Sequence, residues 1–503
     1  MALSASGMLQ AKTIPLDNRH RNTWVPSDSL KGLERLTPSM SASSRRSGVV
    51  PGSSMKDPKS PSVCVVGLGY VGLTTATCFS SRGIHVIGID VDEARVKKIN
   101  AGESVLKEPG LEPLVKRGFQ SGCLEVDSSF SQVSNCEIIF VTVGTPSLDD
   151  GSIDTSYVED AAGEIGKSLR SVKRFRVVVV KSTVVPGTTW RKVKPMLEFE
   201  SRKRVGDDLG LGVNPEFLFE GSAVEDTMNP EALVLGTADE RTKGALLRLY
   251  GRFYGRLPKV ISTTPENAEL MKYAINSFRA VQVSYVNFLA NLCFRVERGE
   301  WEDISKGLAE VGRLDRRYLG PGTGFGGSCL PKDSKALKAF AESVGVEPAI
   351  LGSAIRTNEV QHQEVIRMAE KLVGNLKGRR VAVLGLAFKG GTDDVRDSTS
   401  IEVVHSLLRK GASVSVFDPA AMDNARGILG TKVRYAETAE KCIAGADVCV
   451  IATGWDSFRT LRPSSFKSFM RSPLVVDGRR VFQPEVFKKS GVRLLRVGTA
   501  PFE

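Results

Sequence analysis

Cys329 lies in the part of the chain whose composition is best suited to covalent chemistry. Residues 320–333 read GPGTGFGGSCLPKD, with five glycines and two prolines, which is typical of a loop whose backbone closely approaches another group. Lys332 and Asp333 follow and are expected to open the next helix. A thiol near a helix N-terminus and a lysine has a lowered pKa, so Cys329 is a candidate nucleophile. The alternative is a buried structural cysteine that only fills space.

A second group of residues has the spacing of a dinucleotide-binding turn. The segment VCVVGLGYVGL places Gly67, Gly69 and Gly72 directly after a predicted strand. In such a turn the first glycine permits the tight bend, the second lets the backbone approach a pyrophosphate, and the third lets helix and strand pack closely. Asp90 lies 23 residues after Gly67, at the end of the predicted strand HVIGID. A carboxylate there binds ribose hydroxyls and repels a 2′-phosphate, which favours NAD over NADP; the alternative is a glycine turn without a ligand.

Both groups need a scaffold, and the sequence predicts an α/β one. Short runs rich in Val and Ile alternate with helical stretches: VCVVG, HVIGID, EIIFVTVG, RVVVVKST and LGLGVNPEF. Strands separated by helices in this way indicate a doubly wound parallel sheet. We assign this NAD-binding Rossmann domain to residues 61–262. Hydrophobic residues make up 41% of the 503-residue chain, enough for sizeable cores.

A long helix and a second α/β domain are expected to follow. Residues 266–298 contain no Gly or Pro, and their apolar residues cover more than one face, which predicts a helix buried between domains and against a second subunit. This helix and the Cys329 loop form a central linker, residues 263–375. In residues 376–503 the order strand, glycine turn, helix, strand, Asp returns, in RRVAVLGLAF and in ASVSVFDP with Asp418. The predicted fold is α/β, with two Rossmann-like doubly wound parallel-sheet domains joined by a long central helix.

Residues 1–60 differ from the rest of the chain. They hold 12 serines and no apolar periodicity, and we interpret them as a disordered leader. They lack the apolar stretch of a secretory signal. Their Arg and Ser content faintly resembles a transit peptide, but four acidic residues argue against one: Asp17, Asp28, Glu34 and Asp57. A true start at Met55, just before the first strand, is a third interpretation.

Charge and cysteine content restrict the setting of the protein. Lys and Arg outnumber Asp and Glu by 69 to 57, and the net charge of +12 suits anionic ligands or serves solubility. The eight cysteines form no CxxC pair, which favours neither a zinc site nor a disulfide framework, and no metal is expected. No apolar run reaches about 18 residues, so we expect no membrane span and a reduced, cytoplasmic setting.

Taken together, the motifs from about residue 62 to the end resemble the UDP-glucose/GDP-mannose dehydrogenase family. In chain order they are GLGYVGL, KEPGLEPL, VTVGTPS, KSTVVPGTT, NPEFLFEGSAV, ELMKYAINSF, GFGGSCLPKD, GLAFKGGTDDVRDS and VVDGRR. The resemblance implies two Rossmann-like domains joined by a long helix that forms a dimer. It also implies that a primary alcohol of a nucleotide sugar is oxidised twice, with two NAD, through a cysteine thioester.

The resemblance assigns roles to residues around Cys329. Cys329 would trap an aldehyde as a thiohemiacetal, which a second oxidation turns into a thioester. Lys272 would stabilise oxyanions, with Asn276 one helical turn later on the same face. Asp333 would position or activate water. Further matches are Thr183 and Glu216, which would hold water, and Glu220, a carboxylate near the nicotinamide.

Other matched residues would contact the two ligands. The predicted NAD contacts are Gly67, Gly69, Tyr70, Val71, Gly72, Asp90, Arg95, Thr142, Thr145, Thr183, Glu220 and Arg396. The predicted contacts with the UDP-sugar are Glu216, Phe217, Leu218, Lys272, Asn276, Phe325, Gly326, Lys389 and Arg479. An arginine lent by a neighbouring subunit corresponds to Arg317, with Arg316 as the competing assignment, so a homodimer or higher oligomer is expected.

Ser328 bears on the choice of sugar. N-acetylhexosamine dehydrogenases of the wider family usually carry a histidine at this position before the cysteine. The resemblance therefore favours UDP-glucose, with GDP-mannose or a UDP-N-acetylhexosamine as alternatives. The chain also departs from the family pattern: DRRYLGPG is shorter than the commoner DxRIGxxFLxPG, Phe288 stands where many members have Glu, and Ala232 where many have Arg.

Two other function classes fit less of the sequence. A two-electron hydroxy-acid dehydrogenase of the same fold would need neither Cys329 nor the second domain. A non-catalytic protein that binds NAD or nucleic acid is supported only by the charge of +12, whose basic residues are dispersed and lack an aromatic–basic platform. We therefore expect an NAD-dependent nucleotide-sugar dehydrogenase without a nucleic-acid or membrane partner.

Overall fold

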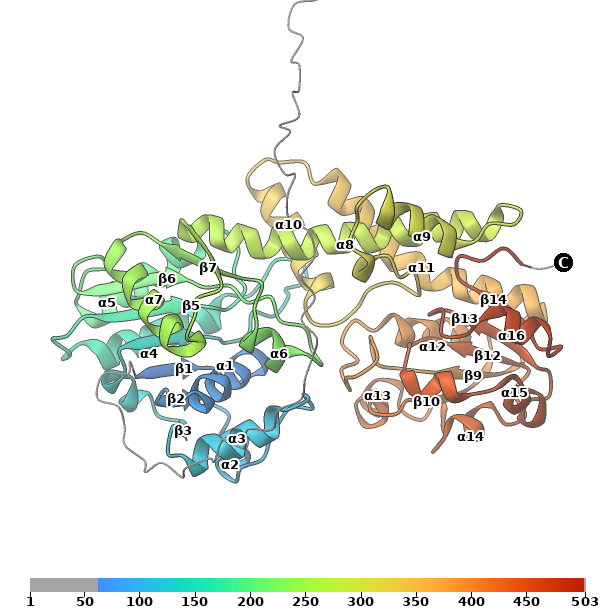
Figure 1. The fold of residues 1–503 in the computed structure, drawn as a ribbon, viewed down its shortest axis with the longest axis horizontal. Helices are drawn as coiled ribbons and strands as arrows, with labels where there is room; N and C mark the ends of the chain where they lie inside the picture. The colour runs from blue at the N-terminus through green and yellow to red at the C-terminus, as the bar shows by residue number, and fades with distance from the viewer. Residues whose placement is uncertain (1–61, 502–503) are drawn as a thin grey trace, which may run out of the picture. The chain divides into compact units, whose positions relative to one another are not determined.

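The computed structural model describes residues 62–501, which form two separate α/β sheets and a group of central helices (Figure 1). The expected leader, residues 1–60, lies outside the described residues. The predicted fold class, two Rossmann-like domains with a long helix between them in the chain, is confirmed.

The first sheet has eight strands in the order β3-β2-β1-β4-β5-β6-β7-β8. They are β1 (Val63–Val66), β2 (Val86–Ile89), β3 (Leu124–Asp127), β4 (Ile138–Val141), β5 (Arg176–Val180), β6 (Leu209–Val213), β7 (Ala232–Thr237) and β8 (Lys259–Thr263). Neighbouring strands are parallel except β6 and β7, which are antiparallel. The strand order reverses between β1 and β4, and sheets of this kind bind ligands at the carboxyl ends of the strands there.

Helices on both faces bury this sheet. They are α1 (Tyr70–Ser81), α2 (Glu93–Asn100), α3 (Leu111–Gln120), α4 (Ser156–Leu169), α5 (Lys194–Ser201), α6 (Ala223–Met228) and α7 (Glu240–Tyr254). Successive residues of a strand point to opposite faces, so Val63 and Val65 join one apolar cluster while Cys64 and Val66 join another. Burial on both faces explains why these strands are continuously apolar in sequence.

Helix α8 (Pro265–Arg295) is the long helix expected at residues 266–298. The Thr264 side chain caps its N-terminus by accepting a hydrogen bond from the amide of Asn267. Pro265 occupies the first helical position, where an N–H group would have no partner within the helix, so the missing N–H of proline costs nothing. The helix ends three residues earlier than expected, because Val296 is extended and Arg298 has a φ of 61°. At 1.5 Å per residue its 31 residues span about 46 Å.

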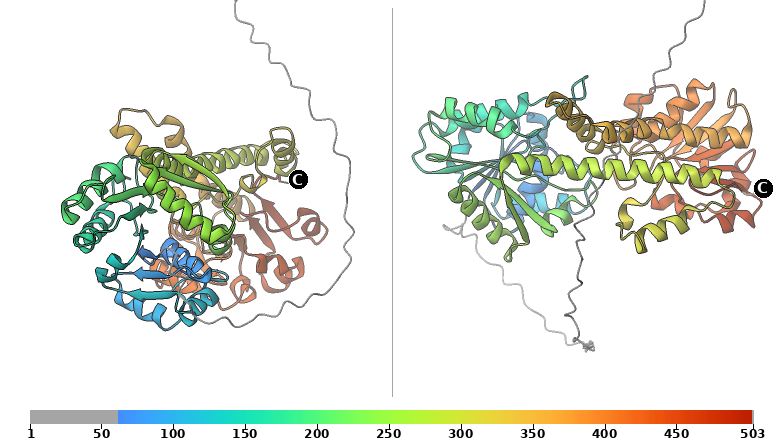
Figure 2. Two further views of the ribbon diagram at one scale, coloured as in Figure 1. Left: turned by 60° about the vertical axis from the view of Figure 1, so that its left-hand side comes forward. Right: turned by 90° about the horizontal axis from the view of Figure 1, so that it is seen from above.

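Three further helices pack beside α8: α9 (Trp301–Glu310), α10 (Leu330–Ser343) and α11 (Ala349–Val373). Figure 2 shows α8 as one continuous helix alongside α11. The two helices are joined by the Ser284 hydroxyl, which donates to the carbonyl of Ala354 at 2.8 Å, and by Asn291 and Gln361 at 2.9 Å.

The second sheet has six parallel strands in the order β11-β10-β9-β12-β13-β14. They are β9 (Arg380–Leu384), β10 (Ser413–Phe417), β11 (Arg434–Tyr435), β12 (Val448–Ile451), β13 (Leu474–Asp477) and β14 (Arg493–Arg496). Its helices are α12 (Thr399–Arg409), α13 (Met422–Leu429), α14 (Ala439–Ile443), α15 (Pro463–Phe469) and α16 (Pro484–Lys488). The repeat noted in the sequence is present, since Asp418 binds the turn after β9 through the amide of Leu386 at 2.7 Å, as Asp90 does after β1 through that of Leu68.

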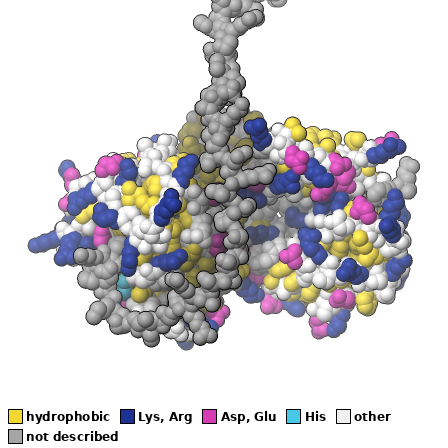
Figure 3. Space-filling model, viewed as in Figure 1, with side chains coloured by type: hydrophobic (Ala, Val, Ile, Leu, Met, Phe, Trp, Pro, Cys, Tyr) yellow, Lys and Arg dark blue, Asp and Glu magenta, His cyan; other side chains and the backbone are white. Residues whose placement is uncertain are grey.

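On the face drawn in Figure 3, Lys and Arg side chains are interspersed with Asp and Glu. This distribution agrees with the dispersed charge of the sequence and does not resemble the continuous basic stripe of nucleic-acid-binding proteins. Within residues 62–501, no helix combines the length and apolar character needed to cross a membrane.

Candidate active site

The glycine turn after β1 has the shape that a dinucleotide requires. Gly67 has a φ of 94°, and a Cβ there would lie 2.9 Å from Val143. At Gly72 a Cβ would lie 1.8 Å from the carbonyl oxygen of Gly67, so α1 can start beside the strand only with glycine here. At Gly69, by contrast, a Cβ would meet nothing within 4 Å. The backbone at the N-terminus of α1 is therefore open to an incoming pyrophosphate, and the residues fit NAD.

Asp90 closes this turn from the end of β2. Its carboxylate is 5% exposed and accepts hydrogen bonds from the Leu68 amide at 2.6 Å and from the Arg95 guanidinium at 2.8 Å. Arg95 also lies 3.5 Å from Asp92. The fold thus brings together Asp90 and Arg95, both predicted as cofactor contacts. Asp90 also holds the glycine turn in place through the Leu68 amide.

Three threonines mark the carboxyl ends of the next strands. The Thr142 hydroxyl, after β4, donates to the carbonyls of Val66 at 2.9 Å and Gly67 at 2.7 Å. The Thr145 hydroxyl donates to the carbonyl of Thr183, after β5, at 2.9 Å. All three predicted contacts therefore lie along the sheet edge that carries the glycine turn.

Glu108, in the KEPG motif, is a residue of this region to which the sequence analysis assigned no role. Its buried carboxylate accepts hydrogen bonds from the amides of Gly221 at 2.6 Å and Ala223 at 2.7 Å, and it also bonds to the Tyr70 hydroxyl. Glu108 therefore ties the glycine turn to the loop that contains Glu220. The motif was visible in the sequence, but nothing in its spacing indicated these partners.

A buried ion pair joins α8 to the loop that follows β6. The Lys272 ammonium lies 2.8 Å from the Glu216 carboxylate and also donates to the Glu216 carbonyl at 2.6 Å. Burial by itself raises the pKa of Glu216, but Lys272 and the amide of Leu218 outweigh it, and the net pKa is lowered. For Lys272 burial lowers the pKa, and the facing negative charges, Glu216 first among them, raise it above its usual value. Both groups are therefore held in their charged forms.

A second buried contact joins α8 to α10. The Asn276 side-chain amide donates to one oxygen of the Asp333 carboxylate at 2.7 Å, and Lys332 lies 2.6 Å from the other oxygen. Asp333 is 1% exposed. Asn276 follows Lys272 by one helical turn, so the same face of α8 presents a cation and an amide to two different carboxylates.

Cys329 is the N-cap residue of α10, as its position before Lys332 and Asp333 suggested. The expectation of a lowered thiol pKa is wrong. Although solvent reaches Cys329, protein surrounds most of the thiol, and this burial is the largest cause of a raised pKa. Lys272 lowers the pKa, but the carboxylates of Glu216 and Asp333 raise it. The sequence shows the nearby lysine and helix start, whereas only the fold places two carboxylates around the same thiol.

The glycines before Cys329 allow the loop to touch the second α/β domain. A Cβ on Gly326 would lie 2.3 Å from the carbonyl of Asp397, and one on Gly327 would lie 2.7 Å from the ring of Phe388. The predicted close approach of this backbone to another group is therefore present, and the group is the segment of residues 388–397 itself. The loop can follow this path only without side chains at these positions.

Asn358 on α11 clamps the predicted substrate contact Phe325. Its side chain accepts from the Phe325 amide at 2.7 Å and donates to the Phe325 carbonyl at 2.9 Å. Arg479, which follows the end of β13, binds the same loop by donating to the carbonyl of Gly324 at 3.2 Å. Burial lowers the pKa of Arg479 to about 10. Asn358 has no motif signal, because its partner is a backbone unit distant in sequence.

Glu220 is the meeting point of the two α/β domains. Lys389 donates to its carbonyl, and Arg396 lies 3.5 Å from its carboxylate. Burial, followed by the charge of Asp394, raises the pKa of Glu220, and Arg396 partly offsets this. Tyr70, Glu220 and Arg396 line one cavity of about 730 Å³. Predicted cofactor contacts from three distant segments are therefore brought together. The Ser328 hydroxyl also reaches Glu220, at 3.2 Å, and lies 3.5 Å from the Cys329 sulfur.

The two candidate subunit-crossing arginines have partners in their own chain. Arg317 lies 2.7 Å from Asp315 and 3.6 Å from Glu231, and its side chain is 65% exposed. Arg316 lies 3.0 Å from Glu310. A cavity of about 350 Å³ is lined by Arg317 together with Glu216, Phe217 and Leu218. Which arginine reaches a partner subunit stays a prediction.

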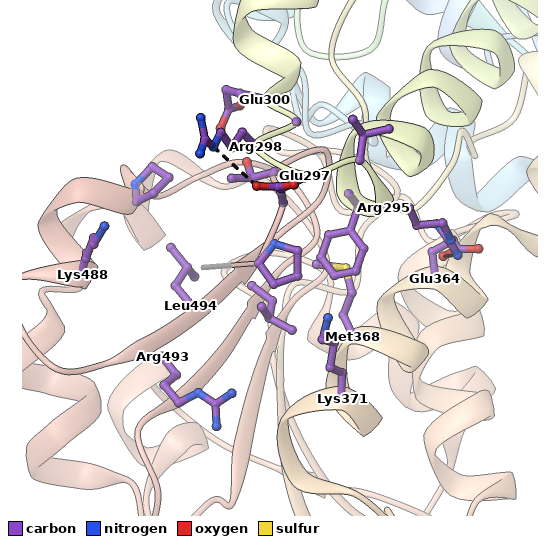
Figure 4. Close-up of a pocket in the computed structure, with 18 of the residues that line it drawn as sticks. Arg295, Glu297, Arg298, Glu300, Glu364, Met368, Lys371, Lys488, Arg493 and Leu494 are labelled. Atoms are coloured by element: carbon purple, nitrogen blue, oxygen red, sulfur yellow. Dashed lines mark hydrogen bonds and ion pairs between the residues drawn. The ribbon is translucent and has the colours of Figure 1, made fainter. Parts of the chain in front are cut away.

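A further cavity, of about 1360 Å³, lies away from these residues (Figure 4). Its walls come from the end of α8, from α11 and from residues 484–501, and none of the predicted site residues is among them. Acidic side chains there are already paired: Glu364 lies 2.7 Å from Arg295, and Glu297 lies 3.7 Å from Arg298. This cavity is not the predicted active site.

Comparison with known proteins agrees with this arrangement. Three consecutive segments match the UDP-glucose/GDP-mannose dehydrogenase family: residues 61–254 its NAD binding domain, residues 266–360 its central domain and residues 382–484 its UDP binding domain. The chain is 39% identical over 421 residues to the UDP-glucose 6-dehydrogenase AglM of Haloferax volcanii, covering 83% of this chain and 96% of that protein.

Solved structures show the same similarity. A UDP-glucose dehydrogenase from Pyrobaculum islandicum superimposes with a TM-score of 0.79 at 40% identity, covering 86% of this chain and 96% of that one. A UDP-D-ManNAc dehydrogenase from Pyrococcus horikoshii superimposes with a TM-score of 0.77 at 28% identity, covering 87% and 99%.

Proposed function

The chain belongs to the UDP-glucose/GDP-mannose dehydrogenase family, and on that premise we propose that it oxidises the C6 hydroxyl of UDP-glucose to the carboxylate of UDP-glucuronate with two NAD. The observation that carries the proposal is the group of reactive side chains around one thiol. Cys329 is electrostatically coupled to the Lys272–Glu216 pair and to Asp333. A two-electron dehydrogenase would have no use for a cysteine in this position.

The net reaction defines what these side chains must do. An alcohol, two NAD and one water become a carboxylate, two NADH and three protons. Bound NAD would accept one hydride in each oxidation, and Gly67, Gly69, Tyr70, Val71, Gly72, Asp90, Arg95, Thr142, Thr145, Thr183, Glu220 and Arg396 would hold it. The protein must therefore remove protons, stabilise oxygen anions and hold the aldehyde between the two oxidations.

Cys329 would hold the aldehyde. Its sulfur adds to the aldehyde carbon to form a thiohemiacetal, the second oxidation yields a thioester, and water then releases the carboxylate and frees the thiol. Lys272, which is kept charged by Glu216, would stabilise the negative oxygen in each of these stages. Asp333, oriented by Asn276, would accept the proton of the attacking water. Glu216 and Thr183 would hold water near the reacting carbon.

The UDP-sugar would lie against both α/β domains. We assign its contacts to Phe217 and Leu218 on the loop after β6, to Phe325 and Gly326 before Cys329, and to two cations of the second domain, Lys389 and Arg479. Arg479 and Lys389 are partly buried, so their charges face little competing water and suit a diphosphate.

Ser328 supports glucose as the sugar. Its hydroxyl bonds to Glu220 and lies beside the Cys329 sulfur, a place that holds histidine in N-acetylhexosamine dehydrogenases. The higher identity to the UDP-glucose dehydrogenase, 40% against 28% for the UDP-D-ManNAc enzyme, agrees with this choice. GDP-mannose and UDP-N-acetylhexosamines are the alternative substrates.

The stoichiometry of NADH formation tests the function. The protein is mixed with a limiting amount of UDP-glucose and excess NAD, and NADH absorbance is followed to completion. We expect two NADH per UDP-glucose, with UDP-glucuronate as product. GDP-mannose and UDP-N-acetylglucosamine, the alternative substrates, are assayed in parallel for comparison. One NADH with accumulation of the aldehyde would contradict the double oxidation, and no NADH from any nucleotide sugar would contradict the activity.

We further propose that the enzyme is at least a homodimer whose contact includes α8. Four exposed apolar residues of α8 follow a heptad-like spacing that is typical of helix–helix contacts: Phe278, Tyr285, Phe288 and Leu292. Their exposed fractions of 66%, 55%, 49% and 44% are high for such large side chains in a lone chain. A dimer would also give the arginines at 316 and 317 a partner subunit.

Two remaining assignments belong to the same proposal. The division into residues 61–262, 263–375 and 376–503 is supported by the two sheets, the first of which ends with β8 at Thr263, and by the helices between them. A reduced, cytoplasmic setting is supported by the eight cysteines, all of which are free thiols. A mechanism that depends on the Cys329 thiol needs such a setting.

A further inference from the structure

Lys181 is a partly buried cation at the start of the loop that carries Thr183, and the proposed mechanism does not use it. It follows β5 directly, and its ammonium crosses to the end of the neighbouring strand β6. There it donates to the side-chain oxygen of Asn214 at 2.9 Å. Lys181, Asn214 and Glu216 line the same cavity of about 350 Å³.

Asn214 uses its whole side chain to connect four elements. Its side-chain oxygen accepts from Lys181 and from the Tyr250 hydroxyl on α7, and its amide donates to the carbonyl of Val234 on β7 at 2.9 Å. Asn214 is 1% exposed, so an unmade bond would leave a buried polar atom without a partner. Because Glu216 is only two residues further along the chain, fixing Asn214 also restricts the backbone position from which the Glu216 side chain extends.

The charge of Lys181 also acts on the reactive pair. The titratable groups that face it are Glu216 on the loop, Lys272 on α8 and, through Asn214, Tyr250 on α7. Glu216 attracts Lys181 and Lys272 repels it, so Glu216 lies between two cations that compete for it. Burial lowers the pKa of Lys181 to about 8, so this charge can change in the pH range in which enzymes work.

We propose that Lys181 is a positioning residue that anchors the Glu216 segment through Asn214 and whose charge sets the pH range in which the Glu216–Lys272 pair operates. The inference rests on the proposed dehydrogenase function. At pH values below the pKa of Lys181, its charge stabilises the Glu216 anion and opposes the charge of Lys272. Above it Glu216 becomes more basic and Lys272 holds its proton more firmly. Because the proposed mechanism uses the Lys272 charge to stabilise oxygen anions, the rate of oxidation should rise as Lys181 loses its proton and no longer opposes that charge.

The test compares Lys181→Met and Lys181→Arg with the wild type, measuring kcat and KM for UDP-glucose from pH 6.5 to 10. The wild type should show a rise in kcat through about pH 8. Lys181→Met removes the hydrogen bond that anchors Asn214, and should lose about tenfold in kcat with little change in KM. Because it also removes the titrating charge, its profile should lack the rise near pH 8. Lys181→Arg keeps the charge throughout, so the rise should be absent up to pH 10. The exposed Lys173→Met serves as the matched control, with an unchanged profile.

The outcomes separate this inference from the function on which it rests. Absence of NADH formation in the wild type would contradict the function itself. A wild-type rise near pH 8 that persists in both variants would overturn the role of Lys181 alone. If Lys181→Met fails to fold, Lys181→Arg decides by whether the rise near pH 8 is absent. Tyr250→Phe removes the other donor to Asn214 but no nearby cation, so its kcat should fall while its rise stays near pH 8; a shifted rise there would count against the charge of Lys181 as the cause.

Discussion

At the scale of single residues, the reactivity of Cys329 depends on a balance of opposing charges. Burial and the carboxylates of Glu216 and Asp333 raise the thiol pKa, while Lys272 lowers it. The thiol is therefore mostly protonated at neutral pH in the free protein. Its proton must be removed during the reaction, and a base and the Lys272 charge are both within electrostatic reach. In the proposed mechanism, Cys329 would therefore be made reactive by its partners in the site and not by a low pKa of its own.

The substitution Cys329→Ser tests the covalent step. Serine keeps the shape of the residue, but its hydroxyl is a far weaker nucleophile at neutral pH, so overall turnover should fall by at least about a hundredfold. Binding of NAD and UDP-glucose should change little, because serine keeps the shape of the residue. The first oxidation does not need the thiol, so only the later steps should be blocked. Steady-state NADH formation and intact mass after mixing with substrate and NAD are the measurements.

Cys123→Ser is the control for this variant, because Cys123 is a partly exposed free cysteine at the start of β3 with no contact to the site. Its turnover should equal that of the wild type. Turnover like the wild type in Cys329→Ser as well would show that Cys329 only packs in its loop.

At the scale of elements, α8 is the platform of the site. Glu269, Lys272 and Asn276 follow one another at intervals of three and four residues, so they share one face. Each binds a different segment: Glu269 the residues 187–189 after β5, Lys272 the loop after β6, and Asn276 the start of α10. One helix thereby sets the relative positions of three loops that are far apart in sequence.

Glu269 offers a test of this platform through stability. Its buried carboxylate accepts hydrogen bonds from the amides of Gly187 at 2.5 Å and Thr189 at 2.9 Å. Glu269→Ala leaves both amides unsatisfied, which should lower the free energy of unfolding by about 2–4 kcal/mol. Urea unfolding measures the loss, and kcat should fall with it because the Thr183 loop loses its anchor.

Glu269→Gln is the matched variant, since it keeps one acceptor oxygen and should lose less stability. Burial raises the pKa of Glu269 above its unfolded value, so ionising it costs stability. This cost is absent below the unfolded pKa and grows as the pH rises through the folded pKa. Glutamine cannot ionise, so its deficit relative to the wild type should be smaller at pH 8 than at pH 5. A deficit that grows with pH would be inconsistent with a raised pKa.

At the scale of the whole molecule, the proposed active site draws residues from both α/β domains. Glu220 belongs to the first domain and receives Lys389 and Arg396 from the second, while Glu108 holds the loop of Glu220 to the glycine turn. Three of the predicted NAD contacts, Tyr70, Glu220 and Arg396, thus line a cavity whose walls come from both domains. A chain with an NAD binding domain and a UDP binding domain would gain from this arrangement, because the reacting atoms of two bound nucleotides would meet at the junction.

The oligomeric state gives a prediction at the same scale. We expect a particle of at least twice the chain mass of 54.4 kDa in light scattering after size exclusion. Phe278→Asp places a charge on the exposed apolar face of α8, and the particle should shift toward the monomer with a loss of activity. Phe199→Asp alters a phenylalanine on α5 that is even more exposed, at 78% against 66% for Phe278, and should leave the dimer intact. A dimer that survives Phe278→Asp would show that this face is not the contact.

The sequence by itself determined the fold class, the glycine turn and the long helix. These features depend on local patterns: glycines within six residues, apolar strands bounded by turns, and a stretch without Gly or Pro. Such patterns act through the backbone conformation and the burial of one segment, so they are visible within a short stretch of sequence. The repeat of the α/β pattern after residue 376 is visible for the same reason.

Only the tertiary structure decided which charges meet. Lys272 and Glu216 are 56 residues apart, Asn276 and Asp333 are 57, and Glu220 and Arg396 are 176. The resemblance to a family named most of these residues, but it indicated neither the Glu108 and Asn358 contacts nor the raised pKa of Cys329. Burial and electrostatic potential are sums over all neighbours in space, so the sign of a pKa shift follows from the packed fold and not from adjacent residues.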